Sequence, residues 1–321
     1  MTSESNEERT EDIVHLLAAP PGYDPYQTPN GPCFAARSTG LFASRDGAKS
    51  WHNLFSSLGL QEPLAALTVA VSPGFDRDHT LFVGVPGGIL RSTDEGATWE
   101  VFTFPTPPPV FSSIVLSTHY PQDGVAFAST TEDGVYRSED HGRLWSPSNF
   151  GLLDLQAYCM AISPDFANDE MLLIGCESGI FRSSNGGRAW REVNFQLGYV
   201  SVFHLEISPD FHDDKMIFAG TDGQGLLIST DGGDNWVPSG DITDPIDAIV
   251  LEKDFQNNGS LLLLTNGQIL LSQDRGKSFT VWEPAASEAG SITAVCAPQG
   301  FTRGRPVLLG IQGGSIKVIS G

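Results

Sequence analysis

Two acidic residues stand at matching places in two similar short segments: Glu177 in "GCESG" and Asp222 in "GTDGQG". Inverting glycoside hydrolysis uses such a pair of carboxylates, one as general acid and one as general base, about 6.5–9.5 Å apart. The chain carries 39 Asp and Glu residues, so the pair also fits two ordinary turn acids. Hydrolysis of a glycosidic bond by Glu177 and Asp222 is therefore one hypothesis for this chain.

Motifs for other chemistries are missing from the sequence. The seven His are scattered, with neither an HExxH motif nor a His pair at metal-ligand spacing, and there is no P-loop or G-x-S-x-G turn. We expect no metal and no cofactor. The four cysteines (Cys33, Cys159, Cys176 and Cys296) lie in apolar runs without a CxxC pair, which favours buried reduced thiols. Cys159 and Cys176 could face each other across one hairpin, so an oxidised pair is an open alternative.

The charge of the chain restricts its partners. Its 18 Lys and Arg against 39 Asp and Glu give a net charge of −21, which repels nucleic-acid phosphates and anionic lipid. We therefore expect a protein or peptide partner with basic character, and neither nucleic acid nor a membrane surface. The start, "MTSESNEERTED", is acidic and lacks the apolar run of a signal peptide, so we expect a cytoplasmic protein.

The elements that would position these residues follow from an eight-residue unit that recurs six times. Its serines stand at 44, 92, 138, 183, 229 and 272, a period of 43 to 48 residues, which is typical of propeller blades. In each unit an Asp can accept N–H groups of its own turn, Gly permits positive φ, and an aromatic residue opens the next strand. The unit therefore predicts a structural turn in every blade. Its residues are Ser44, Asp46 and Trp51; Ser92, Asp94, Gly96 and Trp99; Ser138, Asp140, Gly142 and Trp145; Ser183, Asn185, Gly187 and Trp190; Ser229, Asp231, Gly233 and Trp236; and Ser272, Asp274, Gly276 and Phe279.

Each period predicts four short strands, A to D, with the unit between C and D. Short β-prone runs interrupted by 35 Gly and 21 Pro favour an all-β fold. Strand A first appears near residue 13, and A, B and C recur a seventh time at 291–298, 306–311 and 315–320. We therefore predict a single seven-bladed β-propeller of four antiparallel strands per blade over residues 13–321. Residues 1–12 are either an acidic tail or the strand that closes the last blade, which otherwise has three strands.

The unit resembles the Asp-box, or BNR repeat, of pattern S-x-D-x-G-x-T-W. Propellers with this box include sialidases, xyloglucanase-like glycosidases, sortilin-type receptors, and photosystem II stability and assembly factors. The resemblance implies the propeller fold and a structural role for the boxes, and it implies no particular reaction.

Propellers bind on the face formed by the D–A and B–C connections. Two of the D–A connections here are "GLLDLQAY" (Gly151 to Tyr158) and "FQLGYVSVF" (Phe195 to Phe203). Only one arginine, Arg37, is expected on this face. A sialidase site needs a cluster of arginines, so the sequence does not predict one here. Three others, Arg91, Arg137 and Arg182, precede box serines and are expected to form ion pairs between blades. The candidate binding residues are Arg37, Glu132, Asp133, Asp154, Tyr158, Glu177, Tyr199, Asp222 and Asp244.

The sequence thus favours a non-catalytic propeller that is a rigid platform for a protein or peptide. The alternatives are an inverting two-carboxylate glycosidase using Glu177 and Asp222, and an assembly factor resembling those of photosystem II.

Overall fold

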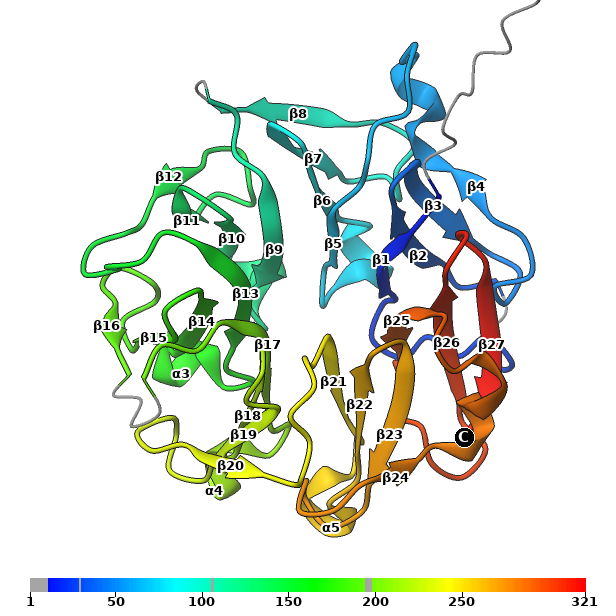
Figure 1. Cartoon of the computed structure of the whole chain (residues 1–321). Coiled ribbons are helices and arrows are strands. Elements are labelled where there is room, and N and C mark those ends of the chain that lie inside the picture. Colours follow the sequence, from blue (N-terminus) through cyan, green and yellow to red (C-terminus); the bar gives the residue numbers. More distant parts are fainter. Residues whose placement is uncertain (1–10, 29, 105–106, 194–197) are drawn as a thin grey trace, which may run out of the picture.

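Seven antiparallel sheets stand around a central axis in the computed structural model, which describes residues 11–28, 30–104, 107–193 and 198–321 (Figure 1). Six sheets have four strands each, and the seventh has three. The predicted all-β, seven-bladed propeller is confirmed. The alternative in which the last blade has three strands is the one seen, within the described residues.

Within each blade, the strands follow one another outward from the axis in chain order. The innermost strands are β1 (Val14–Ala18), β5 (Thr68–Val71), β9 (Phe111–Leu116), β13 (Ala157–Ile162), β17 (Val202–Ile207), β21 (Ala248–Leu251) and β25 (Ile292–Cys296). The second strands are β2 (Cys33–Arg37), β6 (Leu81–Val85), β10 (Ala126–Thr130), β14 (Leu172–Cys176), β18 (Ile217–Thr221), β22 (Leu261–Thr265) and β26 (Pro306–Ile311). The third strands are β3 (Gly40–Ser44), β7 (Gly88–Ser92), β11 (Gly134–Ser138), β15 (Ile180–Ser183), β19 (Leu226–Ser229), β23 (Gln268–Ser272) and β27 (Ile316–Ser320). The outer strands are β4 (His52–Asn53), β8 (Glu100–Thr103), β12 (Ser146–Pro147), β16 (Arg191–Glu192), β20 (Val237–Ser239) and β24 (Thr280–Val281).

The helices are single turns. Five follow inner strands: α1 (Phe75–Asp78), α2 (Tyr120–Asp123), α3 (Phe166–Asp169), α4 (Phe211–Asp214) and α5 (Phe255–Asn258). Two 3-10 helices, η1 (Leu54–Leu58) and η2 (Glu283–Glu288), follow outer strands. In the described part of the chain, no helix has the length and hydropathy of a membrane span.

The hydrophobic core is divided into layers between neighbouring sheets. One layer joins Leu173 and Ile180 of the fourth blade to Leu205 and Ile217 of the fifth, all of them at most 4% exposed. Because both faces of a blade are covered in this way, second strands such as β14 are buried along their whole length.

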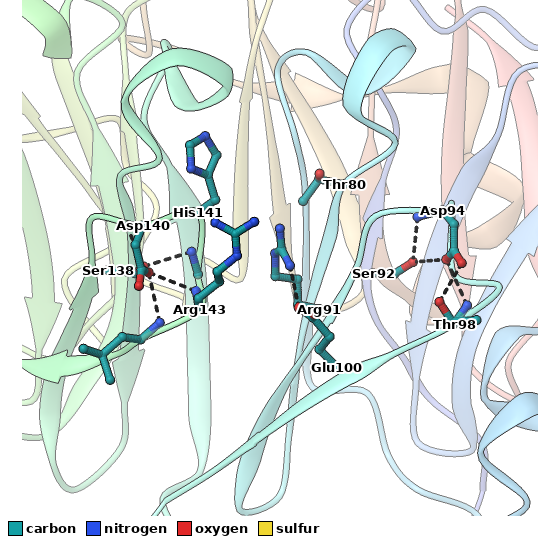
Figure 2. Close-up of polar contacts among 12 residues, drawn as sticks. Thr80, Arg91, Ser92, Asp94, Thr98, Glu100, Ser138, Asp140, His141 and Arg143 are labelled. Atoms are coloured by element: carbon teal, nitrogen blue, oxygen red, sulfur yellow. Dashed lines mark hydrogen bonds and ion pairs between the residues drawn. The ribbon is translucent and has the colours of Figure 1, made fainter.

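The boxes are closed networks of local hydrogen bonds (Figure 2). In the second blade, Ser92 Oγ donates to Asp94 Oδ1 at 2.7 Å and accepts the Gly96 N–H at 2.8 Å. The Asp94 carboxylate accepts the Thr98 N–H at 2.9 Å and the Thr98 hydroxyl at 2.6 Å. In the sixth blade, the equivalent bonds from Ser278 lower the pKa of Asp274 to about 2. The boxes that carry an aspartate therefore stabilise their turns through a carboxylate that stays charged.

The fourth blade uses an amide in place of this carboxylate. Asn185 Oδ1 accepts the Ser183 hydroxyl and the Ala189 N–H, each at 2.9 Å. The turn geometry thus depends on the acceptor oxygen more than on its charge.

The boxes also join adjacent blades. Gly142, with φ of 78°, lies so close to Phe82 of the preceding blade that a Cβ would stand 2.3 Å from its ring. The Trp145 ring of the same box packs edge-on against Phe82, with centroids 5.9 Å apart. In the fourth blade, Trp190 Nε1 donates to the Ser148 carbonyl at 2.7 Å. The predicted turn within each blade is therefore also a contact between blades.

The arginines that precede box serines do not all pair as expected. Arg91 lies between two boxes in Figure 2 and pairs at 2.5 Å with Glu100 of its own blade. Arg137 pairs with Glu139, also in its own blade. Only Arg182 crosses to the next blade, where Asp234 lies 2.8 Å away. The expectation of pairs between blades is wrong for Arg91 and Arg137, since each has a carboxylate nearby in its own blade.

All four cysteines are free thiols. Cys159 lies in the core layer between the fourth and fifth blades, and Cys176 lies in the layer on the other side of the fourth blade. Burial raises the pKa of the Cys159 thiol to about 12. Because strand neighbours on opposite faces of a sheet point apart, this arrangement does not favour the Cys159–Cys176 disulfide.

The first and last blades meet without a shared sheet. Val14 of β1 packs on the backbone at Gly310 of β26, where a Cβ would lie 2.7 Å from the valine. Asp12 forms an ion pair with Arg37 of its own blade, and both side chains lie against Gly314 of the last blade. Gln312 Nε2 of the last blade donates to the Glu11 carboxylate at 2.9 Å. Of residues 1–12, which were expected as a tail or a closing strand, residues 1–10 lie outside the described residues.

Replacing Asp94 with Ala should lower the free energy of unfolding by roughly 1–2 kcal/mol, as for the loss of a helix-capping carboxylate, because the Thr98 donors lose their acceptor. Replacing it with Asn should cost less, since Asn185 fills this position in the fourth blade. Denaturant unfolding of both variants measures the difference. An alanine variant as stable as the wild type would contradict the structural role of the box.

Replacing Asp12 with Ala should destabilise the junction between the first and last blades by about 1–3 kcal/mol, because the half-buried Arg37 guanidinium loses its counter-charge. Thermal melting measures the effect, with Glu62→Ala, at an exposed loop acid, as the control. An Asp12→Ala variant that melts at the same temperature as the wild type would contradict this role of the ion pair.

Candidate functional site

The connections from second to third strands and those that enter each blade meet at one end of the ring. The N–H of Glu177, after β14, donates to the Gln156 carbonyl just before β13 at 3.1 Å. The N–H of Asp222 likewise donates to the carbonyl of Ser201, just before β17, at 3.0 Å. These bonds place both turns on one face, as the sequence analysis expected.

An open groove of about 620 Å³ lies on the fourth blade at this face. Its walls come from the connection before β13, from the β14–β15 turn, from the third strand β15 and the outer strand β16, and from the connection before β17. Its lining residues are Leu153, Asp154, Leu155, Gln156, Glu177, Ser178, Phe181, Glu192 and Tyr199. Three of the predicted binding residues, Asp154, Glu177 and Tyr199, are therefore brought together in one groove.

Asp154 has a structural part in this groove. Its carboxylate accepts the N–H of Gln156 at 2.9 Å and the N–H of Ser178 at 2.8 Å. One bond folds its own connection, and the other fixes the β14–β15 turn against that connection. Asp154 thus contributes a fixed negative charge and holds the shape of the wall.

Glu177 is exposed, and one of its oxygens accepts the Gln156 Nε2–H at 2.5 Å. Tyr158, on β13, packs edge-on against Phe203 of β17, with ring centroids 5.3 Å apart. Partial burial, together with the charges of Glu177 and Asp154, raises the pKa of the Tyr158 phenol. The predicted residue Tyr158 therefore lies next to the groove, within the field of its carboxylates.

Exposed apolar side chains gather at the same place. Leu153 is 79% exposed and Tyr199 is 86% exposed, while Leu155 and Phe203 are also open to solvent. Residues 194–197, which precede Tyr199 in the same connection, lie outside the described part of the chain. The segment "GLLDLQAY" was expected on this face but its leucines were not predicted as binding residues, although apolar residues in a connection were the available signal. Glu192, which the two-residue strand β16 places at the groove, was not predicted either.

The other predicted residues lie on the same face but away from the groove. Glu132 and Asp133 are in the β10–β11 turn of the third blade, and Asp244 is in the connection before β21. Arg37 ends β2, where the Asp12 carboxylate neutralises it and its guanidinium covers the Phe42 ring at 4.3 Å.

The two carboxylates proposed as a catalytic pair occupy adjacent turns. Ser201 links them, because its hydroxyl donates to the Glu177 carbonyl at 3.2 Å and its carbonyl accepts the Asp222 N–H. Only Glu177 lines the groove. Outside the gaps at 1–10, 29, 105–106 and 194–197, no cluster of three or more His, Cys, Asp or Glu residues has an arrangement that could hold a metal ion.

The chain is similar to known proteins in its fold and not in its sequence. No protein-family model and no curated protein sequence matches the chain. Among solved structures, the GH74 xyloglucanase from Xanthomonas campestris matches with a TM-score of 0.71 and 16% identity, over 95% of this chain and 51% of that one. The extracellular domain of BT4673 from B. thetaiotaomicron matches with a TM-score of 0.70 and 14% identity, over 97% of this chain and 38% of that one. The chain thus spans about half or less of these two proteins.

A structure described as YCF48 bound to D1 peptide matches over the whole length of both chains. Its TM-score is 0.67 at 15% identity, covering 97% of this chain and 94% of that one. Together these likenesses show the fold of a seven-bladed propeller. At these identities they establish the fold alone.

Replacing Glu177 with Gln should shift the titration of Tyr158 to lower pH, because removal of a nearby negative charge makes the phenolate easier to form. The phenol titration, followed by NMR of ring-labelled tyrosine, measures the shift. Glu132→Gln, at the turn of the neighbouring blade, is the matched control and should leave Tyr158 unchanged. Identical titrations in all three proteins would contradict the placement of Glu177 beside this ring.

Proposed function

We propose that this chain is a non-catalytic propeller that binds a protein or peptide through the groove on its fourth blade. The observation that carries this proposal is the gathering of exposed apolar side chains, chiefly Leu153 and Tyr199, around an open groove on the expected binding face. Apolar patches of this kind on soluble proteins commonly mark contact surfaces.

The rest of the molecule supports the role of a platform. The core is packed between blades, and the boxes of the third and fourth blades contact the blade before them, so the groove walls stand on a packed scaffold. The turn and the connection that line the groove are fixed by Asp154. A preorganised surface pays less conformational entropy on binding than a mobile one.

The likenesses to solved structures favour binding over hydrolysis. YCF48, which matches along its whole length, is described as bound to a peptide. The xyloglucanase is about twice as long as the matched part, so its activity involves a larger protein. An assembly role similar to that of the photosystem II factors would be one form of peptide binding.

Selection of random peptides displayed on phage tests this function. We expect wild-type protein to enrich related sequences, and a Leu153→Ser, Tyr199→Ser double variant to lose them, because apolar contact area is removed from the groove. Val237→Ser, at an exposed valine of outer strand β20, is the matched control and should retain them. Absence of enrichment, or enrichment that survives the double variant, would contradict binding in this groove.

An activity assay on the same proteins distinguishes the binding hypothesis from the glycosidase hypothesis. A panel of glucans and xyloglucans should show no turnover by the wild type. If turnover occurred and Glu177→Gln reduced it by two or more orders of magnitude, the glycosidase hypothesis would replace the present one.

A further inference from the structure

The groove is acidic as well as apolar, and this combination defines its partner further. Three of its lining residues, Asp154, Glu177 and Glu192, carry carboxylates. The lining set contains neither Lys nor Arg. Apolar surface within an unbalanced negative field is unusual for a wall that only has to be soluble.

Along β15 and β16, successive side chains point to opposite faces of the sheet, which places Glu192 and the neighbouring arginines on different faces. Phe181 of β15 and Glu192 of β16 are directly opposite each other, and both line the groove. The next pair, Arg182 and Arg191, points to the other face of the sheet, where both arginines contact Asp234 at 2.8 and 3.1 Å. These two arginines are thus paired on the far side of the sheet from Glu192.

The carboxylates of the groove differ in how many of their oxygens already accept a hydrogen bond. Both oxygens of Asp154 accept backbone N–H groups, and one oxygen of Glu177 accepts the Gln156 amide. Glu192 is exposed, and within the described ranges its carboxylate has neither a hydrogen-bond nor an ion-pair partner. A cation between Glu177 and Glu192 would therefore meet free acceptor oxygens beside the field of Asp154.

Resting on the function proposed above, we propose that the groove binds an extended peptide segment in which an arginine or lysine lies close to a large apolar side chain. The apolar side chain packs on Leu153, Leu155 and Tyr199, and the cation lies between Glu177 and Glu192. Charge complementarity supports this occupant and disfavours a second copy of the chain, whose net charge is also −21.

The peptides from the phage selection give the first test. We expect groove-dependent sequences to be rich in arginine or lysine next to leucine, phenylalanine or similar residues. Groove-dependent peptides that lack a cation would overturn this inference and leave the binding function standing. Absence of any groove-dependent peptide would overturn both.

Defined probes give the quantitative test. Capped alanine–glycine peptides that carry one leucine and one arginine, with none to three residues between them, are titrated by fluorescence anisotropy. For the spacing that binds best, replacing arginine by citrulline and replacing both Glu177 and Glu192 by Gln should each weaken binding by about tenfold or more. Combined, the two changes should weaken it little further, because they remove the same interaction.

The controls distinguish a specific contact from general attraction. A Glu62→Gln, Glu283→Gln variant removes the same charge from exposed positions outside the groove and should bind within about twofold of the wild type, since screened charges at a distance contribute little. Equal losses in both double variants would show only non-specific attraction to an acidic protein. That result would overturn the inference, as would failure of every leucine–arginine spacing to bind.

Discussion

The close approach of each box to the blade before it is the constraint on which the ring depends. At Gly142, no side chain fits between the turn and Phe82, and the Trp145 ring of the same box packs on that phenylalanine. The local bonds of the Ser and Asp side chains hold the turn in the shape that permits this approach. The same box residues form both the turn and the contact with the preceding blade. The box therefore recurs with the blades, at a period of 43 to 48 residues along most of the chain.

This constraint also explains where the molecule can vary. Boxes and single-turn helices occupy one end of the blades and are tied by repeated bonds, such as Ser163 Oγ to Asp169 at 2.6 Å. The opposite end carries connections of different length and composition, including the one that brings Leu153 to the surface. A repeated scaffold and a non-repeated face together allow one blade to differ from the other six without disturbing the ring.

Much of the fold could be predicted from sequence because its signals are local. The box residues, the turn glycines and the alternating strands lie within a few positions of one another, so spacing alone indicated seven blades. Whether the last blade has three strands or takes a fourth from the N-terminus stayed open until the structure showed three within the described residues. The site was only partly predictable. Asp154, Glu177 and Tyr199 were named from their connections, but Glu192 reaches the groove through strand pairing with Phe181, which the sequence does not show. The prediction for Arg91 failed for the same reason, since Glu100 lies opposite it on the neighbouring strand of its own blade.

The asparagine in the box of the fourth blade has a chemical consequence for the ageing of the protein. Asn185 is followed by Gly186, and an asparagine before glycine is the pair in which the backbone nitrogen most readily attacks the side-chain amide and releases ammonia. Here the amide oxygen is held by the Ser183 hydroxyl and the Ala189 N–H, which restrains the side chain. Where the resulting ring opens to restore the normal backbone, the product is aspartate, the residue already present at this position in the other five boxes. Deamidation, a damaging event in many proteins, would here return the blade to the common sequence of its repeat.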